Sequence, residues 1–279
     1  MSWKRTIIAI LVLVTAVFAR TSIPFDPARG LVEIEVELDG HIRGVFGIDT
    51  GADQLYIDRA FAVKNGLSFA PETPTAEVVG VDGSSRGSAI SLRSLTFGRE
   101  LLVNQRAVAI DIAGLTGDKD ATVPDGLIGY EVLKQFFVTV DYPAKTLELT
   151  QDLPRFIYGN RYHTVPFTQY RHLVIVMAQF DGQVEAPMIL DYCASYTSLS
   201  KRLAERLTLT KDERGFNIAG EIRVGEKVVS RDVPVVVTDF SLYRRSTPRA
   251  EYEGILGASF LREHKITVDY RTQQIYIHK

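Results

Sequence analysis

The stretch Ile48-Asp49-Thr50-Gly51-Ala52 is the starting point for interpreting the whole chain. An apolar segment precedes the aspartate, and a second apolar segment follows the turn. This pattern predicts a strand that ends in a tight turn and presents the carboxylate there. For Asp49 the ordinary interpretation is a turn aspartate that accepts hydrogen bonds from its own backbone.

Two separated blocks of the sequence recur later in the chain, each at a constant offset. The block around Asp49 recurs around Asp191 at an offset of 142 positions, and a second block recurs at an offset of 128. The first copy therefore holds 14 more residues between its blocks, which a surface loop accommodates at small cost. Agreement in two separated blocks indicates an internal duplication. The matching segments are 39–40 with 181–182, 126–129 with 254–257, and 139–142 with 267–270.

The local pattern is that of short strands joined by turns. Residues 32–38 alternate apolar and acidic side chains, as a half-buried strand does. Residues 138–149 predict a hairpin around a proline-containing turn, and residues 266–277 repeat it. The chain is therefore expected to be mainly β.

Helices are expected to be short. Asp58 can cap a helix over 59–65, and Ser200 can cap one over 201–207. The seam between the two copies is expected within 151–160, which contains a proline and a glycine.

The N-terminus has the pattern of a secretory signal. Lys4 and Arg5 precede an uncharged apolar run over 7–19, which ends in small residues. A membrane-spanning helix needs about 20 apolar residues, so this run is short for an anchor. We expect an exported protein, periplasmic or secreted, with an uncleaved inner-membrane anchor as the alternative. The expected units are a signal peptide at 1–19, an N-terminal lobe at 20–153 and a C-terminal lobe at 154–279.

Composition and charge argue against several classes of partner. The 279 residues are 46% hydrophobic, which suffices for a sizeable core. A formal net charge of −2 gives no reason to expect a nucleic-acid partner or a general attraction to membranes. Cys193 is the only cysteine, so no intramolecular disulfide can form and packing alone is expected to hold the lobes. The five histidines lack metal-ligand spacing and no phosphate-binding loop occurs, so no metal or cofactor is expected.

The turn at 49–52 and two later glycine segments together resemble the aspartic protease clan, which includes pepsin-like and retroviral-type enzymes. Those segments are hydrophobic-hydrophobic-Gly at 127–129 and 255–257, and the resemblance covers both copies. It implies a mainly β fold of two pseudo-symmetric lobes, each a closed β-barrel of the acid-protease type, with short helices. The compact lobes are more similar to a fused retroviral-type pair than to a full-length pepsin. The implied activity is that of an aspartic endopeptidase with one aspartate per lobe, Asp49 and Asp191.

Paired carboxylates suit peptide hydrolysis by water. One group must remove a proton from water while another protonates the developing oxyanion or the leaving amine. Two carboxylates about 3 Å apart cannot both ionise, so they share one proton and divide these roles. Their titration belongs to the pair.

The resemblance also implies supporting roles for neighbouring residues. Thr50 offers a short hydroxyl that can bond across the lobe junction. Gly51 lets the backbone approach the carboxylate and adopt conformations closed to other residues. The dyad-support set is Thr50, Gly51, Ala52, Tyr192, Cys193, Ala194, Ile128, Gly129, Leu256 and Gly257.

A hairpin with a glycine-bearing tip is expected at 78–84. Similar proteins use such a hairpin as a flap whose edge pairs with an extended peptide, and an ordinary hairpin tip is the alternative. A weaker flap candidate in the second copy lies at 218–220. The flap set is Val79, Gly80, Val81, Asp82 and Gly83.

The second copy departs from the pattern directly after Asp191. Tyr192 stands opposite Thr50, and its hydroxyl lies at the far end of a ring, so it cannot reproduce the short threonine bond. Cys193 stands opposite Gly51 and brings a side chain where bare backbone was useful. A displacement of about 1 Å in such a dyad can cost on the order of 100-fold in rate.

Two functions of different classes therefore remain open. The first is an endopeptidase that acts on a peptide or protein substrate as a monomer. The second is a pseudoprotease that binds extended peptides without turnover. Pairing of N-terminal lobes between chains ranks last, because the tethered second lobe already occupies that surface. For Cys193 itself, a catalytic thiol is the alternative to a small buried hydrophobe.

Overall fold

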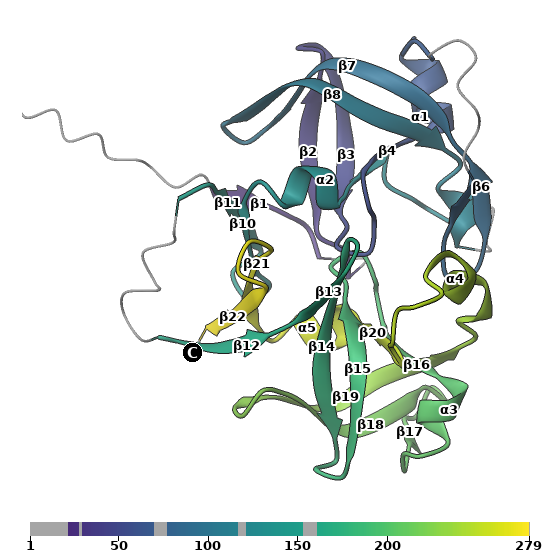
Figure 1. Cartoon of the computed structure of the whole chain (residues 1–279), viewed down its shortest axis with the longest axis vertical. Helices are drawn as coiled ribbons and strands as arrows, with labels where there is room; N and C mark the ends of the chain where they lie inside the picture. Colours follow the sequence, from purple (N-terminus) through teal and green to yellow (C-terminus); the bar gives the residue numbers. More distant parts are fainter. Residues whose placement is uncertain (1–21, 28–29, 70–76, 117–120, 153–160, 279) are drawn as a thin grey trace, which may run out of the picture.

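The structure, a computed structural model, describes residues 22–27, 30–69, 77–116, 121–152 and 161–278. It holds two closed β-barrels at opposite ends of the molecule and a further sheet beside their junction (Figure 1). Within the described ranges, no helix is long and apolar enough to cross a membrane. The expected signal peptide and the boundary at 153/154 both lie outside the described residues.

The first barrel closes six strands in the order β2-β3-β9-β4-β8-β7. Alternation in β2 works as predicted: Ile34, Val36 and Leu38 point into the barrel and are buried. The elements of this half are β1 (Ser22–Pro24), β2 (Glu33–Leu38), β3 (Ile42–Ile48), β4 (Leu55–Asp58), α1 (Arg59–Lys64), β5 (Glu77–Val79), β6 (Ser84–Arg86), β7 (Ser88–Phe97), β8 (Glu100–Ile110), η1 (Ala113–Leu115), β9 (Gly126–Ile128), α2 (Tyr130–Leu133), β10 (Phe137–Asp141) and β11 (Thr146–Thr150).

The second barrel repeats the first in the order β14-β15-β20-β16-β19-β18 and closes through pairing of β14 with β18. Its strands β15, β16 and β20 have the bounds of β3, β4 and β9 at the offsets of the sequence repeat. The elements of this half are β12 (Tyr162–Pro166), β13 (Thr168–Tyr170), β14 (Leu173–Phe180), β15 (Val184–Leu190), β16 (Thr197–Ser200), α3 (Lys201–Ala204), β17 (Thr210–Lys211), β18 (Asn217–Val224), β19 (Val228–Thr238), α4 (Ser241–Ser246), β20 (Gly254–Leu256), α5 (Ala258–Leu261), β21 (Lys265–Asp269) and β22 (Gln274–His278). The predicted mainly β class, with two closed barrels and short helices, is confirmed.

The two halves share a six-stranded sheet in the order β1-β11-β10-β21-β22-β12. At its centre β10 and β21 run antiparallel, and Thr139 pairs with Thr267, its counterpart at the offset of 128. Their buried hydroxyls lie 2.7 Å apart. Equivalent residues therefore face each other across a pseudo-two-fold axis. The expectation that packing alone holds the lobes is wrong, because backbone hydrogen bonds of this sheet also join them.

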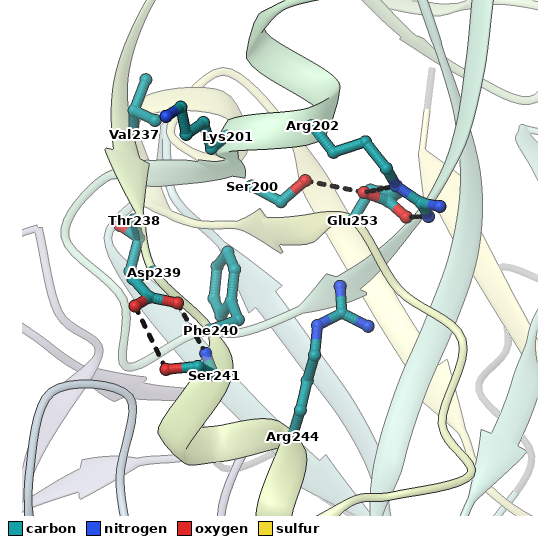
Figure 2. Close-up of a pocket in the computed structure, with 10 residues that line it drawn as sticks. All are labelled: Ser200, Lys201, Arg202, Val237, Thr238, Asp239, Phe240, Ser241, Arg244 and Glu253. Carbon is teal, nitrogen blue, oxygen red and sulfur yellow. Dashed lines mark hydrogen bonds and ion pairs between the residues drawn. The ribbon is translucent and has the colours of Figure 1, made fainter.

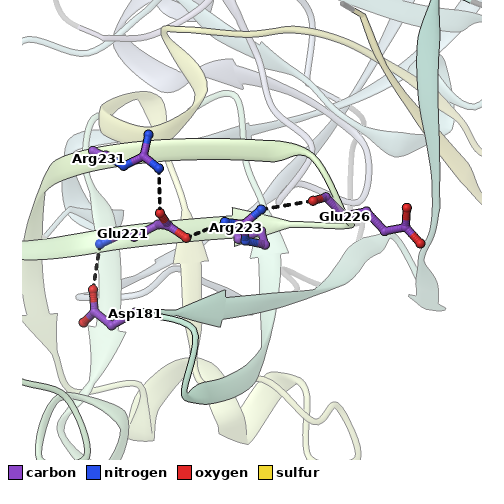
Figure 3. Close-up of polar contacts among 5 residues, drawn as sticks. All are labelled: Asp181, Glu221, Arg223, Glu226 and Arg231. Carbon is purple, nitrogen blue, oxygen red and sulfur yellow. Dashed lines mark hydrogen bonds and ion pairs between the residues drawn. The ribbon is translucent and has the colours of Figure 1, made fainter.

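In each barrel an aspartate in a turn between two strands forms hydrogen bonds to the strand that closes the barrel. Asp181 adopts a positive φ of 49°, and its Oδ1 accepts the backbone N–H of Glu221 on β18 at 2.8 Å. Glu221 in turn forms ion pairs with Arg223 and Arg231, as Figure 3 shows. Asp39 makes the equivalent backbone bonds to β7 in the first barrel. This explains why the Asp-Gly pairs at 39–40 and 181–182 recur in the sequence.

The helix caps follow the sequence expectations. Asp58 accepts the backbone N–H groups of Ala60 and Phe61 at the start of α1. Ser200 accepts that of Leu203 in α3, which ends at Ala204 and is shorter than the expected 201–207.

Candidate active site

The structure brings the two aspartate turns together at the junction of the barrels. Each turn follows a barrel strand and is anchored to the hydrophobic-hydrophobic-Gly segment of its own lobe. Asp49 N–H donates to the Ile128 carbonyl at 3.0 Å, and Asp191 N–H donates to that of Leu256 at 3.1 Å. The backbone thus presents both aspartates in the same way.

The two carboxylates converge on Gly51. A methyl group placed on Gly51 would lie 2.9 Å from Asp191 Oδ2 and 3.2 Å from Asp49 Oδ1. Backbone donors hold both side chains: Gly51 N–H bonds Asp49 Oδ1 and Cys193 N–H bonds Asp191 Oδ1, each at 2.8 Å. Gly51 is needed here for space. The expectation that it adopts a conformation closed to other residues is wrong, because its φ is not positive.

The protonation of the pair follows from its surroundings. Burial raises the pKa of Asp49 well above its usual range, and the nearby charge of Asp191 raises it further. Burial raises the pKa of Asp191 to about 6, although the Cys193 and Gly51 backbone donors oppose this. Both residues keep partial solvent exposure. The pair can therefore retain a proton near neutral pH and still be reached by a solute.

Thr50 makes the cross-lobe bond that its short hydroxyl allows. It is fully buried, its Oγ1 donates to the Leu190 carbonyl at 2.7 Å, and it accepts the Tyr192 N–H at 3.2 Å. One hydroxyl thus joins the first turn to the backbone of both β15 and the second turn.

Tyr192 points away from the carboxylates into the core. Its side chain is fully buried, its hydroxyl donates to the Ile266 carbonyl at 3.3 Å, and its ring lies 6.4 Å from that of Tyr142. The ring is not wedged between the two aspartates. The second turn has therefore exchanged a cross-lobe hydroxyl for core packing.

Cys193 keeps the backbone role of its glycine counterpart and turns its side chain aside. A methyl group on Gly47 would lie 3.0 Å from Cys193 Sγ, so the missing side chain of that glycine leaves room for the sulfur. Cys193 packs against a small apolar cluster of the first lobe that includes Leu127 and Ile112. The expected intrusion of a side chain at the dyad does not occur.

The glycine segments support the turns by close backbone contact. Ala52 O accepts the Tyr130 N–H at 2.9 Å, and Ala194 O accepts the Ala258 N–H at 2.7 Å. A Cβ on Gly129 would lie 2.7 Å from the Ala52 carbonyl oxygen, and one on Gly257 would lie 2.6 Å from that of Ala194. A side chain at either glycine would therefore push the aspartate loop out of place.

The hairpin of β5 and β6 leans over from the first lobe, and its tip runs from Gly80 to Gly83. Gly80 N–H bonds the Gly83 carbonyl at 2.8 Å across the tip. Val81 packs against a buried cluster of the second lobe that includes Phe240 and Tyr243. The hairpin therefore touches both lobes. The weaker second-flap candidate is wrong, because residues 218–220 lie inside β18 and form no tip.

Two tyrosines at equivalent positions, Tyr142 and Tyr270, lie near the dyad. Both are buried, and their hydroxyls have no hydrogen-bond partner among the described residues. Burial raises the pKa of each, and the charge of Asp191 adds to both shifts. Two buried hydroxyls without a partner therefore lie close enough to the second aspartate to be affected by its charge.

Sequence reasoning missed two residues of the second lobe that contact the Asp49 turn. Tyr243, on α4, donates its hydroxyl to the Gly51 carbonyl at 3.3 Å. His172 lies in the turn between β13 and β14, close to the Gly51 backbone, and burial lowers the pKa of its imidazole. Their counterparts in the first copy are Leu115 and Gly30, so the repeat held no signal for either.

A pocket of about 760 Å³ lies on the second lobe beside α4, and neither Asp49 nor Asp191 is among the residues that line it (Figure 2). Its buried Glu253 is already paired with Arg202 and Ser200. In the first lobe β6 covers the equivalent place, where Ser85 Oγ accepts the Asp111 N–H at 2.9 Å. We attribute this pocket to the shorter connection in the second copy, which has 14 fewer residues between its two repeat blocks.

Comparison with known families bears on the first lobe. Residues 34–132 match the family described as aspartyl protease. The match supports an aspartyl protease family for this part of the chain. It spans the Asp49 turn, the β5–β6 hairpin and the Gly129 segment, and the second lobe lies beyond it. No curated protein matched the chain.

Proposed function

We propose that the protein is an aspartic endopeptidase that hydrolyses peptide bonds with a water molecule activated by Asp49 and Asp191. The observation that carries this proposal is the convergence of one carboxylate from each lobe on Gly51. The match of the first lobe to the aspartyl protease family supports it.

The chemistry assigned to the dyad needs one proton on the pair. The ionised carboxylate removes a proton from water as the oxygen attacks the peptide carbonyl carbon. The protonated carboxyl gives its proton to the carbonyl oxygen, forming a neutral tetrahedral diol. As the diol collapses and the C–N bond breaks, the protonated carboxyl gives its proton to the amine nitrogen. The ionised carboxylate takes a hydroxyl proton from the diol, so the pair ends with one proton, as it began. Because burial raises the pKa of both aspartates, we expect activity to peak nearer neutral than strongly acidic pH.

The substrate class assigned here is an extended peptide or protein segment. The hairpin of β5 and β6 packs in the same apolar cluster as Ala52 through Val78, and its strand edge can pair with extended backbone. Its tip rests on the second lobe through Val81, so substrate entry requires the hairpin to lift. We assign the activity to a single exported chain, because both aspartates come from one polypeptide.

A second candidate is a pseudoprotease that captures peptides without cleaving them. The asymmetry of the cross-lobe bond favours it: Thr50 Oγ1 bonds Leu190, whereas the Tyr192 hydroxyl bonds Ile266 in the core. An imperfectly held second turn could leave the carboxylates out of position.

The test is digestion of a peptide mixture by the purified protein between pH 4 and 8 in ¹⁸O-labelled water. We expect new C-termini that carry one ¹⁸O atom, formed by wild type and not by Asp49→Asn. Equal cleavage by both proteins would remove the proposal. Peptide binding in calorimetry without cleavage at any pH would favour the pseudoprotease.

A further inference from the structure

The second lobe reaches the Asp49 turn through α4. The side chain of Tyr243 is buried, and its hydroxyl donates to the Gly51 carbonyl oxygen at 3.3 Å. This bond joins residues 192 positions apart. Its donor belongs to the second lobe and its acceptor belongs to the first.

The position of the Tyr243 hydroxyl is set by the second lobe. The Tyr243 carbonyl accepts hydrogen bonds from the hydroxyls of Ser246 at 2.7 Å and Thr247 at 3.0 Å. These bonds stabilise the C-terminal end of α4. The ring packs 6.0 Å from that of Tyr252, whose own hydroxyl lies 3.1 Å from Thr247 Oγ1. The phenol is therefore held by packing and hydrogen bonds before it meets Gly51.

The residue that accepts this bond also holds the Asp49 carboxylate. The Gly51 N–H donates to Asp49 Oδ1 at 2.8 Å, and the Gly51 carbonyl accepts the Tyr243 hydroxyl. A hydrogen bond on the carbonyl restrains the Gly51 backbone and therefore the direction of the N–H that meets the carboxylate.

The contact is one-sided within the pseudo-symmetric fold. Leu115 stands opposite Tyr243 at the offset of 128 and has no hydroxyl to offer to the second turn. The second turn has Tyr192 in place of a threonine, and the Tyr192 hydroxyl bonds the Ile266 carbonyl in the core. Extra support from the second lobe is therefore directed at the Asp49 turn.

We propose that Tyr243 is a positioning residue for Asp49 that acts by holding Gly51, whose backbone N–H donates to the Asp49 carboxylate. This inference rests on the proposed function, since it assumes that the carboxylate it orients is catalytic. Tyr243 fixes the donor on Asp49 and thereby favours the ionised form of the pair that removes a proton from water.

The test is Tyr243→Phe, which removes only the hydroxyl and keeps the ring in its cluster. In ¹³C-aspartate-labelled protein, with resonances assigned by Asp49→Asn, we expect the lower apparent pKa of the pair to rise by about a few tenths of a pH unit. The kcat for peptide cleavage should fall by about tenfold, with KM changed by less than about twofold.

Tyr252→Phe is the matched control. It removes a buried phenol hydroxyl from the same cluster, and that hydroxyl bonds Thr247 rather than the dyad loop. Both variants should lower the thermal midpoint slightly, whereas only Tyr243→Phe should shift the carboxylate titration. Thermal unfolding of each variant also establishes that it folds.

Titration curves of Tyr243→Phe that superimpose on wild type would overturn the inference. So would faster cleavage by Tyr243→Phe, because the hydroxyl would then be obstructing the cleft. If wild type cleaves no peptide, the proposed function fails, yet the titration still decides whether Tyr243 acts on Asp49.

Discussion

The turns at 49–52 and 191–194 share the same backbone hydrogen bonds but differ in their side-chain contacts. In both, the aspartate N–H is anchored to its glycine segment, and the residue two positions on donates its N–H to the carboxylate at 2.8 Å. The side chains that follow the aspartates differ: Thr50 forms a hydrogen bond across the lobes, and Tyr192 is buried in the core. A degenerate motif in the sequence therefore need not mean a degenerate carboxylate geometry.

The comparison also shows what each turn position requires. Gly51 lies between the carboxylates and has no room for a side chain. Cys193 has room because Gly47, in the facing lobe, lacks one. The glycine of the second turn was therefore replaceable only because a glycine elsewhere offered space.

The largest change in stability is expected from placing the threonine of the first turn at the equivalent position of the second. Tyr192→Thr should lower the free energy of unfolding by roughly 3 kcal/mol, because it empties a fully buried aromatic site. Urea denaturation with activity measured in parallel checks this. A gain in both stability and cleavage would mean that Tyr192 damages the turn and that our account of its packing is wrong.

Adding a methyl group separates the two glycine positions. Gly51→Ala should lower kcat by about 100-fold, because its Cβ would contact both carboxylates within 3.2 Å. Cys193→Ala, which keeps a Cβ and loses only the sulfur, should change kcat far less. Steady-state kinetics on one peptide measures both, and similar losses would show that the positions are equally constrained.

Neutralising the second aspartate should stabilise the fold in a pH-dependent way. The pKa of Asp191 is raised from 3.8 to about 6, so this residue favours the folded state fully below about pH 4 and ceases to do so as pH rises through 6. Asp191→Asn stays uncharged and should therefore gain on the order of 2 kcal/mol relative to wild type between pH 4 and pH 7. Urea denaturation at both pH values tests this; a difference that does not vary with pH would contradict it.

Much of the fold was predictable because the repeat and the strand alternation are local signals. Offsets of 142 and 128 relate β3 to β15 and β9 to β20, and the alternation over 32–38 matches the burial of β2. The two aspartates were named from the same repeat. Their meeting point depends on both lobes together.

The rest depended on contacts that no local pattern encodes. The direction of the Cys193 side chain is decided by Gly47. The reach of Tyr243 to Gly51 depends on where α4 ends and on how the lobes meet across β10 and β21. The repeat even argued against Tyr243, since its counterpart is an aliphatic leucine.

The measurement that tests the central claim most directly compares Asp49→Asn, Asp191→Asn and the double variant on one cleaved peptide. If the two carboxylates act as one unit, each single change should lower kcat by at least about 1,000-fold, and the double change should add little further loss. Near-wild-type cleavage by Asp191→Asn would contradict the account, because it would show that the second turn takes no part in the chemistry.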